Sequence, residues 1–275
     1  MKRSSLMMAG CALALGSLCS VPANAGDYFS NTEVQLHMDF ARDKGFQDAV
    51  GEDIETDILT VTFLHYSEWK YGDNFGFMDI EGKDGYKVEP DQYYGEFATR
   101  ISFDKIILGA DAGTEMLGSF LKETYLKLEY NGGTPVDGYD YIDDALLYGI
   151  SFDLGLGQPN FGFSNISFLI KDYKIIDEKD SSETSWQVTY VWGQPFSIGS
   201  VNFDFQGFLD VWEYNDQVVV LTEPQIRLKL DSFVGKGNFL SDSAIGMEFE
   251  ISSRFFDQEN SDLLFNPTVF WVTQF

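Results

Sequence analysis

Short segments in which apolar and polar side chains alternate recur along most of this chain. In residues 144–154, apolar side chains occupy the even positions from Leu146 to Leu154, and small or polar ones such as Ser151 and Asp153 lie between them. A period of two places the two sets on opposite faces of a β-strand. The pattern predicts strands at residues 33–40, 57–66, 72–80, 93–103, 120–130, 144–154, 165–176, 184–193, 201–214, 221–230, 243–255 and 266–275.

The last of these segments ends on an aromatic residue at the carboxyl terminus. Val269, Trp271, Thr273 and Phe275 share one face of it. Chain ends usually fray in water, so this strand needs a partner, and an antiparallel partner at the start of the chain would close the sheet. The tail resembles the carboxyl-terminal strand of bacterial outer-membrane β-barrels, which end on Phe after spaced hydrophobic residues. The alternative is the buried last strand of a soluble sandwich.

The amino terminus has the three parts of a secretory signal peptide. Lys2 and Arg3 precede an apolar stretch at about residues 6–18, which leads to Ala23-Asn24-Ala25. This order predicts cleavage before Gly26. A lipoprotein signal ending before Cys11 or Cys19 fits less well, because the first leaves too short an apolar stretch and the second follows a bulky Leu.

Removal of residues 1–25 takes away both cysteines and leaves a strongly acidic chain. Sixteen basic residues remain against 44 acidic ones, a net charge of −28. Such a surface repels nucleic acid, so no nucleic-acid partner is expected. Without cysteine the exported chain has no disulfides, and its stability must come from a core or a closed sheet.

These features together predict an all-β fold, a transmembrane antiparallel β-barrel of 12 strands formed by residues 26–275 in the bacterial outer membrane. The segments have the length of a tilted membrane strand, and an even number of strands is usual for single-chain barrels. No apolar run after residue 25 approaches the length of a membrane helix. Closure is required because a free sheet edge would leave amides unpaired in hydrocarbon.

Several segments resemble the Tsx-type nucleoside-specific outer-membrane channels. They are residues 59–79 (LTVTFLHYSEWKYGDNFGFMD), 94–105 (YGEFATRISFDK), 121–125 (LKETY), 192–199 (WGQPFSIG) and 205–210 (FQGFLD). The resemblance covers most of the mature chain in consistent order. It implies a twelve-stranded monomeric barrel that passes nucleosides by passive diffusion, without catalytic residues or a cofactor.

Candidate solute contacts lie in the third expected strand. Asp73, Phe75, Phe77 and Asp79 share one face. If this face lines the lumen, the rings could stack on a nucleobase while the carboxylates accept hydrogen bonds from ribose hydroxyls. In the alternative, both Asp residues lie at strand ends in water and the rings meet lipid.

Charged residues on the polar faces of other strands are further candidates for the pore lining. Glu96 and Arg100 lie on the fourth strand, Arg227 on the tenth, and Glu248 and Arg254 on the eleventh. A ring of mixed charge would narrow the pore and select dipolar solutes. Equally, paired charges could simply keep the wall rigid. Both interpretations place them inside, because a charge on the lipid face near mid-bilayer costs about 2–4 kcal/mol.

Two other classes of function stay open at this point. One is an outer-membrane enzyme acting on lipid, which would need His37 or His65 beside a nucleophile. The other is a soluble exported β-sandwich that binds a ligand. No G-x-S-x-G motif for a nucleophilic serine is present. Two histidines with no cysteine after residue 25 are too few for a dedicated zinc site, so no metal is expected.

The expected partners follow from a location in the outer membrane. They are outer-membrane lipid and lipopolysaccharide, a small-molecule solute, and the barrel-assembly machinery, which we expect to engage the strand ending at Phe275. The protein is expected to be a monomer.

Overall fold

The computed structural model of the chain describes residues 28–39, 58–83, 85–109, 120–133, 144–155, 162–173, 184–235, 237–238, 240–255 and 261–275. The expected signal peptide, residues 1–25, lies outside these ranges.

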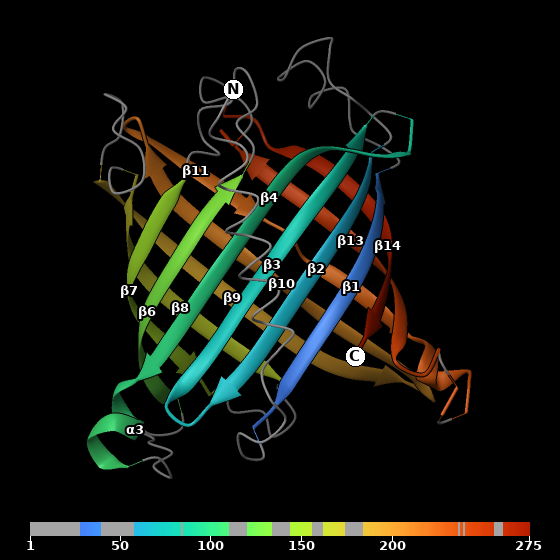
Figure 1. Cartoon of the computed structure of the whole chain (residues 1–275), viewed down its shortest axis with the longest axis horizontal. Coiled ribbons are helices and arrows are strands. Elements are labelled where there is room, and N and C mark those ends of the chain that lie inside the picture. Colours follow the sequence, from blue (N-terminus) through green and yellow to red (C-terminus); the bar gives the residue numbers. More distant parts are fainter. Residues whose placement is uncertain are drawn as a thin grey trace.

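Antiparallel strands form almost all of the described structure (Figure 1). They are β1 (Ser30–Asp39), β2 (Leu59–Trp69), β3 (Gly72–Lys83), β4 (Lys87–Ser102), β6 (Leu121–Gly133), β7 (Ala145–Leu154), β8 (Phe163–Asp172), β9 (Thr184–Ile198), β10 (Val201–Tyr214), β11 (Gln217–Thr222), β12 (Gln225–Lys229), β13 (Ser243–Ser253) and β14 (Leu264–Gln274). Each strand pairs with its neighbours in the sequence, except that β11 and β12 do not pair with each other and both lie between β10 and β13.

The first and last strands pair with each other and close the sheet into a barrel. Leu36 of β1 lies opposite Trp271 of β14, and the N–H of Phe275 donates to the carbonyl of Thr32 at 2.8 Å. The antiparallel partner expected for the carboxyl-terminal strand is therefore confirmed. The closed sheet has no free edge along this seam.

One of the twelve barrel strands is interrupted. Both β11 and β12 pair with β10 on one side and β13 on the other, so together they form a single barrel strand. The interruption falls at Glu223 and Pro224, where proline has no N–H to give to the ladder. The strand expected over residues 221–230 therefore lies in the correct place. The prediction did not include the break, and the observed strand begins earlier, at Gln217.

The earlier start of the observed strand results from a tight turn that the sequence analysis did not recognise. Asn215 and Asp216 both have positive φ, 51° and 61°, and connect the paired residues Tyr214 and Gln217. Positive φ at both central residues is the geometry of a type I′ hairpin. The connection between β2 and β3 is also shorter than the expected residues 67–71, because β2 continues to Trp69.

Helical structure is limited in the described part of the chain. The helix α3 (Phe103–Leu108) follows β4, where the hydroxyl of Ser102 caps it by accepting from the N–H of Lys105 at 3.0 Å. A single turn of 3₁₀ helix covers Leu230–Ser232. Within the described residues, no helix is both long and apolar enough to cross a membrane.

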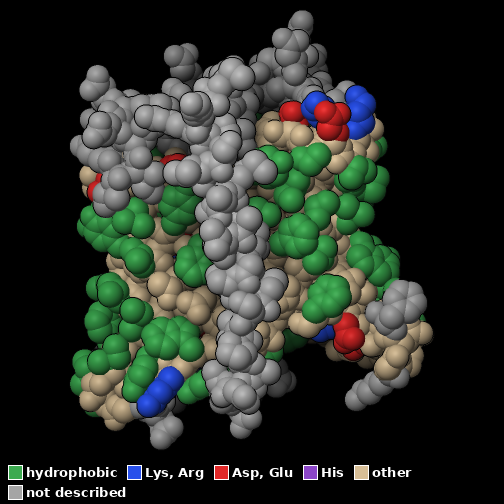
Figure 2. Space-filling view, viewed as in Figure 1, with side chains coloured by type: hydrophobic (Ala, Val, Ile, Leu, Met, Phe, Trp, Pro, Cys, Tyr) green, Lys and Arg blue, Asp and Glu red, His purple; other side chains and the backbone are tan. Residues whose placement is uncertain are grey.

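The two faces of the barrel have opposite polarity. Figure 2 shows hydrophobic side chains over the outer face, with charged ones gathered towards the ends. Exposed apolar residues of that face include Leu36, Phe97, Leu128, Ile150, Phe168, Ile170, Ile226, Ile245 and Trp271, whereas Glu33, His37, Asp73, Lys127, Glu129, Lys171 and Arg227 are buried inside. This is the architecture of an outer-membrane β-barrel. The alternative of a soluble sandwich is therefore wrong.

Candidate functional site: the inner wall of the barrel

The cross-strand register determines which residues share the inner face. Residues directly opposite each other in an antiparallel sheet point to the same side. Asp73 lies opposite both Glu68 and Arg100, and Arg100 lies opposite Lys127. Continued around the barrel, this register places charged and hydrogen-bonding side chains of every barrel strand on the inner wall. Three clusters of these side chains form the candidate site.

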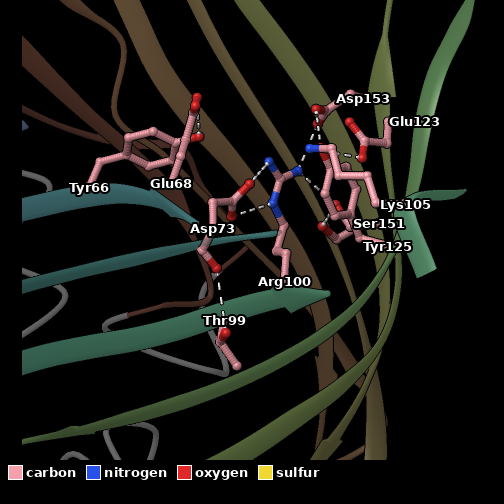
Figure 3. A network of polar contacts seen from close by, with 11 residues as sticks. Tyr66, Glu68, Asp73, Thr99, Arg100, Lys105, Glu123, Tyr125, Ser151 and Asp153 are labelled. Atoms are coloured by element: carbon pink, nitrogen blue, oxygen red, sulfur yellow. Dashed lines mark hydrogen bonds and ion pairs between the residues drawn. The ribbon is translucent and has the colours of Figure 1, made fainter. Parts of the chain in front are cut away.

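The first cluster is centred on Arg100 (Figure 3). Its guanidinium forms a bidentate pair with Asp73, and its Nη1 bonds Asp153 of β7 at 2.7 Å. The guanidinium also lies 4.2 Å from the ring centroid of Tyr125, whose hydroxyl donates to Asp153 at 3.1 Å. Beside it, Lys105 of α3 pairs with Glu123 at 3.1 Å. We call Asp73, Arg100, Tyr125 and Asp153 the Arg100 cluster.

The second cluster lies across the barrel and is centred on Arg227. Its Nη1 donates to Glu33 of β1 at 2.9 Å, and its Nε and Nη2 donate to Gln225 at 3.0 and 2.7 Å. Gln274 of β14 also donates to Glu33, at 2.7 Å. Because β13 and β14 lie between β12 and β1, the arginine bridges the seam of the barrel. We call Glu33, Gln225, Arg227 and Gln274 the Arg227 cluster.

A glycine makes room for this arrangement. Gly246 lies opposite both Arg227 and Phe270, and the ring of Phe270 covers it so closely that a Cβ at this position would collide with the ring. The ring of Phe270 also stacks on His37, with 4.7 Å between the ring centroids. A flat layer of rings and guanidinium therefore covers this part of the wall.

Buried lysines form the third cluster. Lys127 pairs with Glu129, and Lys171 donates to Gln187 at 3.0 Å while its ammonium lies 4.6 Å from the ring of Trp212. Asp210 interacts electrostatically with both lysines. These cations are thus already balanced by groups of the protein.

Aromatic rings line the inner wall between the first two clusters. Phe77 lies 6.1 Å from Phe75 and 5.9 Å from Tyr94, measured between ring centroids. Asp79 accepts from Thr62 and lies opposite Tyr94, whose hydroxyl donates to Glu96 at 2.6 Å. We call Phe75, Phe77 and Tyr94 the aromatic row.

The structure places the residues of the first sequence-derived group together. Asp73, Phe75, Phe77 and Asp79 all face inward, so the arrangement in which the rings meet lipid does not occur. Asp73, however, is committed to Arg100. Glu96, Arg100, Arg227 and Glu248 also face inward.

Arg254 departs from the expected pattern. It lies just past the end of β13 with a φ of 60°, so the alternation stops before it. The strand expected to reach Phe255 therefore ends at Ser253, and Phe255 instead packs edge-on against Trp212 at 5.9 Å. Trp212 and Tyr214 are buried in an inner apolar cluster with Leu147, Leu169 and Val219.

Several inner residues were missed by the sequence analysis. Glu33, Lys127, Lys171 and Asp210 are buried and charged. Glu223, at the break between β11 and β12, was missed as well, although it has the same odd position in the alternation as Arg227. Alternation alone could have found Glu223, whereas the contacts that join distant strands leave no local trace.

The two histidines are held in different places. His37 is buried inside, where its Nε2 lies 2.8 Å from Gln35 and its Nδ1 lies 3.5 Å from Glu248. His65 has its Nδ1 2.8 Å from Thr32 on the outer face. No serine hydroxyl bonds either histidine within the described ranges. Nor do those ranges contain three or more His, Cys, Asp or Glu side chains grouped to hold a metal ion.

Solved structures with a similar outline include porins. A KdgM porin shares 6% identity, with a TM-score of 0.46 over 89% of this chain and 99% of that chain. OccK11 (OpdR) of Pseudomonas aeruginosa shares 10% identity, with a TM-score of 0.37 over 90% of this chain and 96% of that chain. A likeness at this level says nothing of function. No curated protein matches the chain.

A match to a family model assigns the chain to a protein family from its sequence. The model described as "Domain of unknown function (DUF5020)" matches residues 31–275, which include every described strand except the first residue of β1. Neither this model nor the structures above name a Tsx-type channel, so that resemblance stays a proposal. The chain belongs to the DUF5020 family.

Proposed function

We propose that this protein is an outer-membrane channel through which small solutes diffuse passively, with nucleosides as the first candidate. The observation that carries the proposal is the closed barrel whose inner wall is charged and hydrogen-bonding while its outer wall is apolar. A polar wall enclosed by a membrane barrel offers solutes a route that the bilayer denies them.

The aromatic row supports the candidate solute. The faces of Phe75 and Phe77 can stack on a nucleobase, because every base has a flat π-face. Asp79 and Glu96 flank these rings and can accept hydrogen bonds from ribose hydroxyls. Asp73 cannot share this role while it is paired with Arg100.

Conductance and liposome swelling test the proposal. The purified protein should carry current in planar bilayers, adenosine should reduce that current, and liposomes containing the protein should swell in adenosine. Replacing both rings, as in Phe75→Ala with Phe77→Ala, should weaken the adenosine effect. Phe97→Ala is the matched control, because Phe97 lies on the outer face of the neighbouring strand.

Two results would count against parts of the proposal. A folded barrel that passes neither ions nor any small solute would exclude the channel. A conducting barrel that does not respond to adenosine would exclude the nucleoside and leave the channel in place. Boiling distinguishes folded from unfolded protein, since a folded barrel migrates differently on a gel before heating.

The partners of the barrel are proposed on the same basis. The apolar outer face would contact outer-membrane lipid and lipopolysaccharide, and one barrel encloses a complete lumen, which supports a monomer. Phe275 is 78% exposed although its backbone pairs with β1. That free ring supports recognition of the last strand by the barrel-assembly machinery.

A further inference from the structure

The helix α3 carries exposed apolar residues on one side, at the end of the barrel where β4 finishes (Figure 1). Phe103, Ile106 and Ile107 have the i, i+3, i+4 spacing of a single helix face, and they are 38%, 58% and 74% exposed. Leu108, the last residue of the helix, is exposed as well. Large apolar side chains grouped on an exposed surface mark sites of contact with another protein or with a membrane.

The other side of α3 is fixed to the barrel. Asp104 is buried, and its Oδ2 accepts from the N–H of Thr124 on β6 at 3.1 Å. Lys105 pairs with Glu123 of the same strand at 3.1 Å. These two contacts hold α3 against β6 through its polar residues, so its apolar side is turned away from the barrel.

The apolar side of α3 continues the outer face of the barrel. Ile101, near the end of β4, lies opposite Leu126 of β6, which is exposed on the outer face. Phe103 follows Ile101 by two residues and therefore continues on the same side of the chain. The apolar surface thus runs from the middle of β4 and β6 onto the helix without a polar break.

Two aromatic residues beside α3 indicate the level at which it lies. The N–H of Ser102, the residue that caps α3, donates to the carbonyl of Tyr71 at 2.7 Å. The ring of Tyr71 packs edge-on against that of Trp69, at the turn between β2 and β3. Trp and Tyr are enriched where a membrane meets water, so α3 begins at the edge of the apolar belt.

We propose that α3 is a lipid anchor, in which Phe103, Ile106 and Ile107 enter the bilayer at the boundary between headgroups and acyl chains. A helix in this plane buries its apolar side while its polar side stays at the water interface. The bilayer is the occupant because the apolar side of α3 is continuous with the outer face of the barrel. The inference rests on the proposed contact of that face with lipid, and it does not depend on the passage of any solute.

Quenching of a fluorophore by lipid tests the anchor in vesicles of phosphatidylcholine and phosphatidylglycerol. The mature barrel expected after cleavage before Gly26 has no cysteine, so single cysteines can be introduced and labelled. Ile107→Cys reports on α3, and Ile150→Cys, in the middle of β7, reports on the outer face. Gly235→Cys is the aqueous control, because it lies in the connection between β12 and β13 with open space around its Cβ. Lipids carrying a nitroxide at the headgroup or deep in the acyl chain measure depth.

We expect headgroup nitroxide to quench the label at Ile107 several-fold more than the label at Gly235. Deep nitroxide should quench the label at Ile150 most. Heat-modifiable migration on a gel shows that each labelled barrel is folded, and Ile106→Cys gives a second measurement on the same side of α3 if one label disturbs the helix.

Two results would contradict the inference in different ways. If the label at Ile107 is quenched no more than that at Gly235 while the label at Ile150 is quenched, the anchor is wrong, and the apolar side of α3 must instead serve contact with a protein. The lipid-facing barrel would then stand. If the label at Ile150 also escapes quenching in a folded barrel, the proposed contact of the outer face with lipid is wrong, and the anchor with it.

Discussion

Arg100 and Asp73 face each other across β3 and β4 as a bidentate pair, with Nε 2.9 Å from Oδ1 and Nη2 2.7 Å from Oδ2. The same guanidinium bonds Asp153 of β7, two strands further around the barrel. One arginine thus joins strands that are not neighbours in the sheet. The flat guanidinium suits this task because its donors are fixed in a fork.

Removal of this arginine should destabilise the barrel strongly. Arg100→Ala leaves two inner carboxylates without their counter-charge, so we expect the free energy of unfolding to fall by about 3–5 kcal/mol. Arg100→Lys keeps the charge and loses the fork, so its loss should be smaller. Denaturant unfolding in detergent micelles measures both. Lys87→Ala, at an exposed position, should leave stability unchanged, and an equal loss in that control would contradict the role of the Arg100 cluster.

The close approach of Phe270 to Gly246 gives a second prediction. Gly246→Val would push the ring off the wall and disturb its stacking on His37, so we expect a loss of about 1–3 kcal/mol from overpacking. Gly235→Ala is the matched control, because no atom lies within 4 Å of the added Cβ. The midpoint of thermal unfolding reports the difference. If both variants melt alike, the ring does not lie on Gly246.

The apolar outer face can be tested by charge placement. Ile150→Arg puts a guanidinium on the outer face in the middle of β7, where it should cost about 2–4 kcal/mol in a bilayer. Val88→Arg lies near the start of β4, where Val88 is already 77% exposed, and should be tolerated. Folding yield into lipid vesicles, followed by heat-modifiable gel migration, compares the two. Similar yields would mean that Ile150 does not face hydrocarbon.

A substitution at Phe275 tests assembly in the membrane separately from the stability of the folded barrel. Its ring is exposed and its backbone carries the bonds to Thr32, so Phe275→Ala should leave the free energy of unfolding of the purified barrel nearly unchanged. If the assembly machinery recognises the ring, the same variant should reduce the amount of folded protein in the outer membrane several-fold. Quantitative gels of membrane fractions measure that amount. An unchanged amount would exclude recognition through this side chain.

Much of the fold could be predicted because each membrane strand repeats one physical requirement. Hydrocarbon outside and polar groups inside demand a period of two, so the faces of β1, β4 and β7 could be assigned from alternation alone. The closing pair of β1 and β14 followed from the need to protect the last strand. These features depend only on neighbouring residues and on the membrane.

The candidate site could be predicted only in part, because its contacts depend on the shear of the whole barrel. Alternation placed Arg227 inside but could not show that it reaches Glu33, 194 residues away. The inward turn of Phe255 depends on the positive φ of Arg254, which no local pattern signals.

The pairing of β1 with β14 also determines when the barrel can close during folding. Among the barrel strands, β1 is synthesised first and its second partner, β14, is synthesised last, so the sheet around β1 cannot be complete until β14 has been made. Contacts of such long sequence separation form slowly, because the intervening loop must close first. The newly made chain must therefore be kept from aggregating until its last strand is available. The barrel can close only after that point.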